Sequence, residues 1–212
     1  MNFYFLYNNV CMRMRKKKWV LPFLENEKEY LIEDLNDLNI EKPIYIEIGM
    51  GMGDFIVESA IKNPDIFYVG LERVETCVAR AIQKAQENKV SNFRVMLADA
   101  SNIEDLIPNK SIDRIYLHFS DPWPKARQHK RRLTYMPFLS KYEKILKDDG
   151  ELIFKTDNEG FFNDSLEYFE KSNFILKDIN RNYINEDEPM TAYQARFVAL
   201  GMPIYYAKYE LK

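Results

Sequence analysis

The feature that most constrains this fold is a short apolar run followed at once by alternating glycines. Residues 44–48 read Ile-Tyr-Ile-Glu-Ile, and Gly49, Gly51 and Gly53 follow. An apolar run of this length, flanked by Pro43 and a glycine, predicts a buried parallel strand. A helical pattern begins directly after the last glycine. Strand, glycine loop and helix together present backbone N–H groups to a ligand, and glycine accepts the positive φ that such a loop needs.

The spacing within the loop separates two classes of ligand. The dinucleotide fingerprint is G-x-G-x-x-G, whereas this chain has G-x-G-x-G with Glu47 two residues before the first glycine. An acid beside the loop would repel a pyrophosphate and suits a ligand with a positive centre. The pattern E-x-G-x-G-x-G resembles motif I of the class I S-adenosylmethionine (SAM) methyltransferases, whose cofactor is a sulfonium cation. Taken alone, the loop is also compatible with a glycine-rich turn that holds no ligand.

Five short apolar runs alternate with helical patterns along the chain, which predicts an α/β fold with a parallel sheet covered on both faces. Two more strand-like segments come late, at 174–182 and 203–211, on either side of a predicted loop at 191–197. The five predicted strands are residues 44–48, 67–71, 93–97, 112–119 and 151–155, and the predicted helices are residues 25–38, 55–62, 74–88, 136–146 and 160–171.

Acidic residues stand at or just beyond the ends of these strands. Ligands of parallel sheets bind beyond the carboxyl ends of the strands, so these acids should converge on one rim. Glu72 comes 21 residues after Gly51, close to the spacing of about 20 at which an acid binds ribose hydroxyls. Asp99 is placed to accept from an adenine amino group, and a surface carboxylate or a helix cap is the alternative role for each acid. The predicted rim consists of Glu47, Glu72, Asp99, Asp121 and Asp157.

The densest motif is residues 118–133, which read H-F-S-D-P-W-P-K-A-R-Q-H-K-R-R-L. Two prolines bracket Trp123 and stiffen the turn that holds Asp121. A run of charge is usually a solvated face, but the basic residues here directly follow the expected reaction centre, which favours phosphate contacts. A second basic run at 13–18 predicts either a solvated tail or a phosphate-binding arm.

The motif D-P-W-P-K followed by basic residues resembles the bacterial (TrmB-type) tRNA (guanine-N7-)-methyltransferase family. The motifs R-M-R-K-K-K-W, G-L-E, A-D-A, F-K-T-D-N and T-A-Y-Q-A-R-F agree with it, from Met12 onward. The resemblance implies a Rossmann-like class I methyltransferase fold, with a mostly parallel seven-stranded sheet. It implies one domain over residues 12–212 with a basic N-terminal arm, whereas residues 1–11 are an unassigned extension. It also implies SAM as cofactor and methyl transfer to N7 of guanine at position 46, in the variable region of tRNA.

The family's functional positions carry over motif by motif. Cofactor-binding positions fall on Glu47, Gly49, Gly51, Gly53, Glu72, Asp99 and Asp121, and Asp121 also falls on the proposed catalytic position. Substrate-binding positions fall on Lys125, Asp157, Thr191, Ala192, Tyr193 and Gln194. The RNA-contacting segment falls on Arg127, Gln128, His129, Lys130, Arg131 and Arg132. The family usually reads T-x-Y-E near the end, and Gln194 here keeps an acceptor oxygen but loses the charge and gains a donor.

Guanine N7 already carries an in-plane lone pair, so this chemistry needs no strong general base. The main demand is in-line placement of N7, methyl group and sulfur. Methylation moves positive charge onto the purine, which a nearby carboxylate would favour. We expect Asp121 to orient and stabilise, and Asp157 with residues 191–194 to read the guanine.

Composition excludes several other classes of protein. The formal net charge is −3, so a nucleic-acid footprint must be local. The two cysteines lack metal-ligand spacing, which predicts no metal site and favours a cytoplasmic protein. No apolar run approaches the roughly 18 residues of a membrane span. The partners expected are therefore tRNA and no membrane, with the protein a monomer or a homodimer.

Two other functions remain open at this stage. Exocyclic-amine methyltransferases carry a D/N-P-P-Y/F turn after the fourth strand, where this chain has D-P-W-P. A non-catalytic tRNA-binding protein would bind no SAM, and the complete set of acids argues against it.

Overall fold

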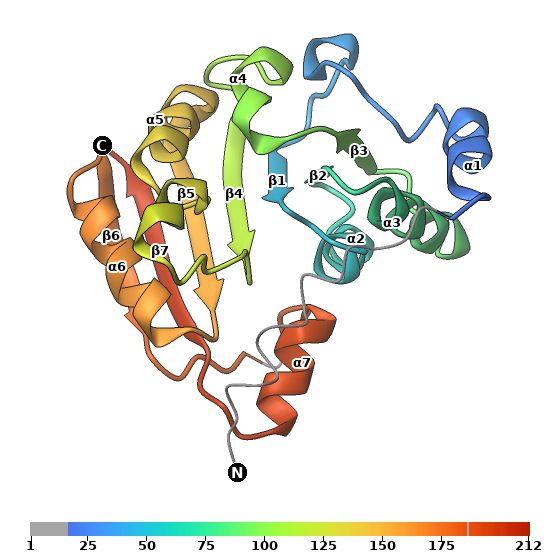
Figure 1. Ribbon diagram of the computed structural model, residues 1–212. Helices are drawn as coiled ribbons and strands as arrows, with labels where there is room; N and C mark the ends of the chain where they lie inside the picture. Colours follow the sequence, from blue (N-terminus) through green and yellow to red (C-terminus); the bar gives the residue numbers. More distant parts are fainter. Residues whose placement is uncertain (1–16, 186) are drawn as a thin grey trace.

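The computed structural model describes residues 17–185 and 187–212 of the chain (Figure 1). The strands are β1 (Ile44–Ile48), β2 (Phe67–Glu72), β3 (Phe93–Leu97), β4 (Ile112–His118), β5 (Leu146–Thr156), β6 (Phe174–Asn180) and β7 (Tyr205–Leu211). The α-helices are α1 (Val20–Asn26), α2 (Asp54–Lys62), α3 (Glu75–Glu87), α4 (Ile103–Leu106), α5 (Met136–Ile145), α6 (Glu159–Glu170) and α7 (Ala192–Ala199). Short 3-10 helices are η3 (Leu35–Asp37), η4 (Ala100–Asn102) and η5 (Ala126–Arg131).

The seven strands form one sheet in the order β3-β2-β1-β4-β5-β7-β6. Strands β1 to β5 pair in parallel, and β7 inserts antiparallel between β5 and β6. The predicted mostly parallel seven-stranded sheet is therefore confirmed. The strand order reverses at β1, which lies between β2 and β4, and such a switch point opens a ligand crevice at the carboxyl ends of the strands.

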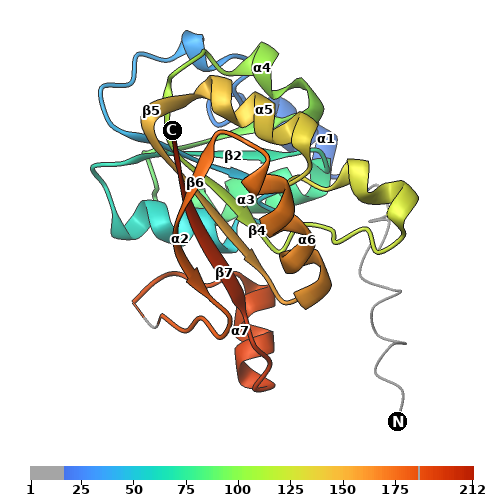
Figure 2. The ribbon, with the colours of Figure 1, turned by 90° about the vertical axis from the view of Figure 1, so that its left-hand side faces the viewer.

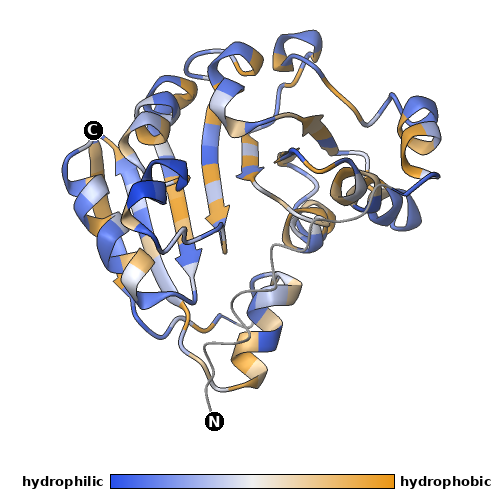
Figure 3. Cartoon of the chain, viewed as in Figure 1, coloured by the Kyte–Doolittle hydropathy of each residue, from blue (hydrophilic) through white to orange (hydrophobic). Residues whose placement is uncertain are grey.

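Helices cover both faces of the sheet. Helices α4, α5 and α6 lie on one face, whereas α2 and α3 lie on the other, with α1 packed against α3 (Figures 1 and 2). Alternation along β1 explains the division. Ile44, Ile46 and Ile48 belong to the apolar core under α4, α5 and α6, whereas Tyr45 packs against the core under α2 and α3. Figure 3 shows that β5 is apolar in its middle and hydrophilic at its carboxyl end, and that η5 is hydrophilic.

Three local predictions were wrong. The predicted helix at 25–38 ends at Asn26, because the chain then bonds to the edge of β3: Val95 N donates to Tyr30 O and Ile32 N donates to Val95 O. The predicted loop at 191–197 contains helix α7, whose first turn is capped by the Thr191 side chain. The strand predicted at 151–155 is longer, because β5 begins at Leu146, and its register with β4 shifts in this added part.

Two further properties concern only the described residues. None of their helices is both long and apolar enough to cross a membrane. No group of three or more His, Cys, Asp or Glu side chains in the same residues is arranged to hold a metal ion. The basic run at 13–18 is described only from Lys17, and residues 1–11 lie outside the described part.

Candidate active site

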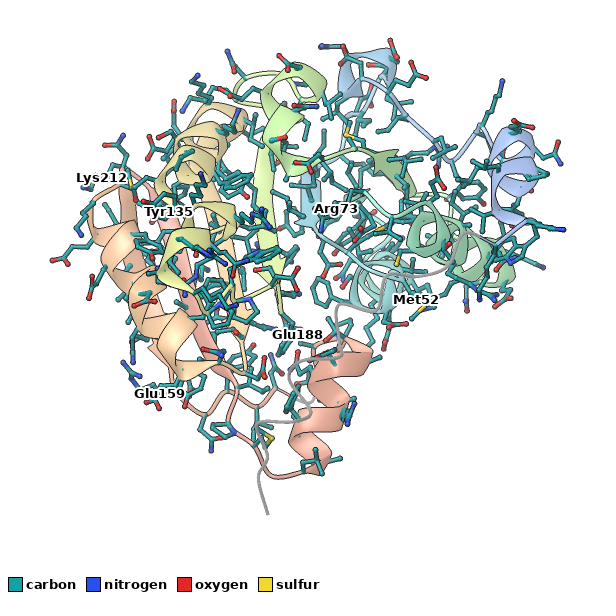
Figure 4. All side chains as sticks on the ribbon, in the orientation of Figure 1. Met52, Arg73, Tyr135, Glu159, Glu188 and Lys212 are labelled. Atoms are coloured by element: carbon teal, nitrogen blue, oxygen red, sulfur yellow. The ribbon has the colours of Figure 1, made fainter. Side chains whose placement is uncertain are left out.

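The predicted acids line the carboxyl edge of the sheet. In spatial order along that edge they are Asp99 after β3, Glu72 at the end of β2, Glu47 near the end of β1, Asp121 after β4 and Asp157 after β5. Helix α7 and the segment before it lie at the same end, and Figure 4 shows Glu188 close to α7, below the ends of the central strands. The sheet thus brings together acids that lie up to 110 positions apart in the sequence, from Glu47 to Asp157.

The glycine loop requires glycine for two separate reasons. Gly49, Gly51 and Gly53 all have positive φ, between 57° and 79°. A Cβ at Gly53 would lie 2.8 Å from the Ala81 Cβ, so this glycine permits close packing of α2 on α3. A Cβ at Gly51 would meet no atom within 4 Å, so the space beside this backbone is open. The loop is therefore packed on one side and free on the side where a ligand would approach.

Glu72 is held in place by three backbone N–H groups. Gly51 N donates to Oε2 at 3.1 Å, and Arg73 N and Val74 N donate to Oε1 at 2.9 and 3.0 Å. Burial raises the pKa of the Glu72 carboxyl, and these hydrogen bonds oppose the shift. The bonds fix both oxygens beside the glycine loop, in a position to accept from a vicinal diol.

Asp99 follows β3 and caps η4. Ser101 N donates to its Oδ1 at 2.8 Å, and this backbone hydrogen bond is the main reason why the pKa of Asp99 is lowered. The Arg73 guanidinium lies 4.0 Å from Oδ2. Asp99 is therefore a fixed anionic acceptor at the β3 end of the acidic rim.

Glu47 is the buried acid of the rim. Its side chain is 2% exposed, with Oε1 3.4 Å from His118 Nδ1 and no hydrogen-bond partner for Oε2 among the described residues. Burial raises the pKa of Glu47 well above its ordinary value, against the lowering effect of the Lys155 charge. Burial also lowers the pKa of His118 well below its ordinary value, so the imidazole is neutral near pH 7. The 3.4 Å approach is therefore a contact with a neutral ring, and Glu47 retains an unpaired acceptor.

The turn that carries Asp121 has a strained backbone. Phe119 and Trp123 have φ of 50° and 40°, in a region that bulky residues rarely adopt. Phe119 N donates to Lys155 O at 2.9 Å, and the Arg131 guanidinium stacks 4.9 Å from the Trp123 ring. Strain of this kind persists only where surrounding contacts hold it, and it gathers at functional sites. Asp121 is therefore exposed between Phe119 and Trp123, which these contacts fix in position.

Tyr193 links the two carboxylates of the acceptor side. Burial raises the pKa of its hydroxyl, and the negative charges of Asp157 and Asp121 raise it further. Its ring lies 6.0 Å from the Phe119 ring. The predicted substrate positions on α7 are therefore close to the Asp121 turn.

Gln194 differs from its neighbours on α7 because it is buried. It is 1% exposed, and its Oε1 has no hydrogen-bond partner among the described residues. Its backbone N–H donates to Thr191 Oγ1 at 2.9 Å, which closes the first turn of α7. A role in contacting guanine stays a prediction for residues 191–194.

The basic segment contains one buried arginine. Arg132 is 3% exposed, and its guanidinium donates to Pro122 O at 2.7 Å, Asp164 Oδ2 at 2.7 Å and Tyr168 Oη at 3.1 Å. These hydrogen bonds direct the guanidinium into the protein, and RNA contact by Arg132 stays a prediction. Lys125, Arg127, Lys130 and Arg131 are exposed, and His129 and Gln128 are partly so.

Sequence reasoning missed the buried cation of the site. Lys155 is 0% exposed and pairs with Glu188, which lies 33 residues later. Lys155 is part of the motif F-K-T-D-N, but the apolar residues before it in the sequence do not indicate which carboxylate it pairs with. Glu188 stands in an acidic stretch that reads as an ordinary surface loop.

The comparisons with known proteins agree with this architecture. A family model described as "Putative methyltransferase" matches residues 41–207. A tRNA (guanine-N(7)-)-methyltransferase of Bacillus velezensis is 40% identical over 210 residues, covering 94% of this chain and 97% of the relative. The protein of the same name from Macrococcus caseolyticus is 42% identical over 204 residues, covering 91% and 97%.

Solved structures share the fold at low sequence identity. A 30S ribosomal A1408 methyltransferase from an uncultured bacterium has a TM-score of 0.61 at 17% identity, covering 84% of this chain and 92% of that one. A SAM-dependent methyltransferase from Aquifex aeolicus has a TM-score of 0.59 at 12% identity, covering 84% and 87%. These likenesses show the class I methyltransferase fold and nothing finer.

Proposed function

The chain belongs to the tRNA (guanine-N7-)-methyltransferase family, and we propose that it transfers a methyl group from SAM to N7 of guanine 46 in the variable region of tRNA. The observation that carries the proposal is the rim of acids at the switch point of the sheet, beside a basic surface on η5. We also propose that the protein works in the cytoplasm, where its tRNA substrate is found.

The residues of the crevice fit SAM. Gly51 leaves open space beside its backbone, and Glu72 offers fixed acceptors for ribose hydroxyls. Asp99 stands ready to accept from the adenine amino group. Glu47 has a buried oxygen without a partner, which suits the positive methionine end of the cofactor. When bound, SAM supplies an electrophilic methyl group on a sulfonium centre.

The acceptor side positions the guanine and stabilises its developing charge. Asp121, held between Phe119 and Trp123, places a carboxylate at the edge of the crevice. Positive charge grows on the purine as N7 attacks, and a preoriented carboxylate lowers the free energy of that transition state. Asp157 and the start of α7 would accept from the guanine N1–H and amino groups, which selects guanine. No group needs to remove a proton from N7, which agrees with the buried and neutral state of His118.

The exposed basic residues bind the RNA backbone. Lys125, Arg127, Lys130 and Arg131 lie on the surface next to the Asp121 turn. A-form RNA hides most base edges, so phosphate contacts and shape supply most of the recognition. Trp123, stacked against Arg131, keeps this surface continuous with the site.

The test is incubation with methyl-labelled SAM and unmodified tRNA, followed by nucleoside mass spectrometry. We expect 7-methylguanosine at position 46, and no product from a tRNA in which guanine 46 is replaced by adenine. Methyl groups on an exocyclic amine would favour the adenine or cytosine methyltransferase alternative. Binding of tRNA without any methyl transfer would favour the non-catalytic protein.

A further inference from the structure

A buried ammonium group lies beneath the carboxyl ends of β4 and β5, and the mechanism above gives it no role. Lys155 Nζ donates to Glu188 Oε2 at 2.5 Å. The same nitrogen lies 4.8 Å from the centre of the Tyr183 ring and 5.8 Å from that of Phe55. The Tyr183 hydroxyl donates to the same Glu188 oxygen at 2.9 Å. Glu188 therefore accepts from two donors, the Lys155 ammonium and the Tyr183 hydroxyl, at the carboxyl end of β5.

Two carboxylates from different parts of the site act on this ammonium group. Burial lowers the pKa of Lys155, and the charges of Glu188 and Glu47 oppose that shift. Glu188 precedes α7, which begins with the predicted substrate positions. Glu47 lies on β1, two residues before the glycine loop. The Lys155 ammonium group also lies 5.8 Å from the ring of Phe55, which is on α2 directly after the glycine loop, so this cation contacts the cofactor side as well as the acceptor side.

The histidine next to this cluster is neutral while Lys155 is charged. His118 pairs with Lys155 in the register of β4 and β5, and its ring packs 4.4 Å from the Phe55 ring. Burial and the Lys155 charge both lower the pKa of His118. Among the described residues of this cluster, Lys155 therefore carries the positive charge alone.

The backbone of Lys155 also supports the turn that carries Asp121. Its carbonyl oxygen accepts from Phe119 N at 2.9 Å, and the Phe119 ring lies 6.0 Å from Tyr193. One residue thus contacts the Asp121 turn through its main chain and the segment before α7 through its side chain.

We propose that Lys155 is a positioning residue that couples occupancy of the cofactor crevice to docking of residues 187–194 over the acceptor side. This inference rests on the proposed function and adds to it a positive coupling between the two ligands of the enzyme.

The sign of the coupling follows from the charges. A buried ammonium without a carboxylate partner is strongly unfavourable, so Lys155 requires Glu188. A cationic ligand beside Glu47 adds positive charge to the same region, which makes the negative charge of Glu188 there more favourable. Undocking of Glu188 then costs more, and the substrate positions on α7 stay in place. We expect the cationic ligand to tighten tRNA binding about tenfold, and tRNA to tighten binding of that ligand by the same factor.

The test compares tRNA affinity with and without sinefungin, a SAM analogue that carries an amine in place of the sulfonium and has no methyl group to transfer. Fluorescence polarisation gives the ratio of the two dissociation constants, and hydrogen exchange of the peptide covering residues 187–199 reports docking without RNA. In the wild type we expect about a tenfold ratio and slower exchange with sinefungin. In Lys155→Met and in Glu188→Gln we expect a ratio near one and exchange that sinefungin leaves unchanged.

The double variant Lys155→Met/Glu188→Gln separates positioning from simple support of the fold. It removes both members of the Lys155–Glu188 pair together, so neither is left without the other, and we expect it to regain part of the thermal stability lost in the single variants. Its tRNA affinity ratio should nevertheless stay near one. Lys177→Met, which removes an ion pair to Glu210 at the β6 edge, is the matched control and should keep the wild-type ratio.

Two results would overturn the proposal. One is a wild-type protein whose exchange at residues 187–199 does not respond to sinefungin. The other is a double variant that keeps the wild-type ratio. Hydrogen exchange needs no RNA. It therefore still tests the role of Lys155 if tRNA proves not to be the substrate, and the two failures can be distinguished.

Discussion

The two halves of the active site are held by different means. On the cofactor side, backbone groups of the glycine loop and of the residues after β2 fix Glu72 through three hydrogen bonds. On the acceptor side, ion pairs between residues far apart in sequence hold the elements together: Arg132 pairs with Asp164, and Lys155 pairs with Glu188. The cofactor side is held by backbone N–H groups, which a side-chain substitution does not remove. The acceptor side depends on the buried charges of Arg132 and Lys155, each of which a single substitution removes.

This contrast matches what each half has to do. A cofactor of fixed shape suits a cradle of backbone N–H groups, which cannot change rotamer. The acceptor side has to admit one base of a large RNA, and its elements α7 and the Asp121 turn are joined to the sheet by a few specific contacts. Substitutions should therefore produce different kinds of loss in the two halves.

The largest expected effect is on turnover. Asp121→Asn keeps the shape of the side chain but removes the negative charge that favours the developing positive charge on guanine. We expect kcat to fall about 10²–10³-fold, the usual cost of losing one preoriented electrostatic group. Single-turnover kinetics with saturating tRNA measures this, with circular dichroism as the check on folding. A near-normal rate in a folded variant would remove Asp121 from the mechanism.

Neighbouring arginines provide the next test. Arg132→Met removes three hydrogen bonds and leaves Asp164 without its partner, so we expect unfolding free energy to fall by about 3 kcal/mol. Arg131→Met, one residue earlier, removes an exposed side chain and should change stability by less than about 0.5 kcal/mol. Urea denaturation of both variants measures the difference. Equal losses would contradict the buried role of Arg132.

Two glycines of the cofactor loop should fail in different ways. Gly53→Ala places a Cβ 2.8 Å from Ala81 at a positive φ, so we expect a loss of about 2–4 kcal/mol from strain and overpacking together. Gly51→Ala has open space, so strain alone should cost about 1–2 kcal/mol. Its added methyl group would instead meet the cofactor. Calorimetric titration should therefore show that Gly51→Ala loses more affinity for S-adenosylhomocysteine than Gly53→Ala does, although it loses less free energy of unfolding.

The phosphate surface predicts a smaller and salt-dependent effect. Replacing Lys130 and Arg131 together by Gln removes two exposed charges beside the Asp121 turn. The slope of log affinity for tRNA against log salt should become shallower by about 1.4–1.8, because each lost phosphate contact changes it by 0.7–0.9. Binding isotherms at several salt concentrations provide the slopes. Lys177→Gln, on the distant β6, should leave the slope unchanged, and an unaltered slope in the double variant would contradict the phosphate role.

The smallest expected effect is on the pH dependence of stability. The folded pKa of His118 lies below the unfolded value of about 6.5, so the unfolded state binds more protons and the wild type loses stability as pH falls through that range. Glu47 has the opposite sign, because its raised pKa lets the folded state take up a proton first. His118→Phe keeps the ring contacts with Phe55 and Tyr116 and removes the unfavourable proton.

We therefore expect His118→Phe to lose less stability than the wild type between about pH 7 and pH 5. Thermal denaturation at a series of pH values measures the difference between the two proteins. His129→Gln, which changes the other histidine, is the control. A parallel shift of both curves at every pH would show that His118 contributes packing alone.

Most of the sheet could be predicted from the sequence because its central strands are largely buried on both faces. Residues 44–48 and 93–97 were predicted with the bounds that the structure has, since continuous apolar runs leave few alternatives. The segment after Asn26 was mistaken for a helix because its apolar spacing is weak and its hydrogen bonds go to Val95, a partner that no local pattern reveals.

The sequence alone determined the cofactor half of this protein, because glycines at fixed spacing and acids at strand ends act through local backbone geometry. Only the tertiary structure decided which charges are buried. Arg131 and Arg132 are alike in sequence, yet one stacks on Trp123 at the surface and the other is enclosed by α6. Lys155 and Glu188 show no relation until the sheet and the segment before α7 meet, because the cost of an unpaired buried charge arises only where water has been excluded.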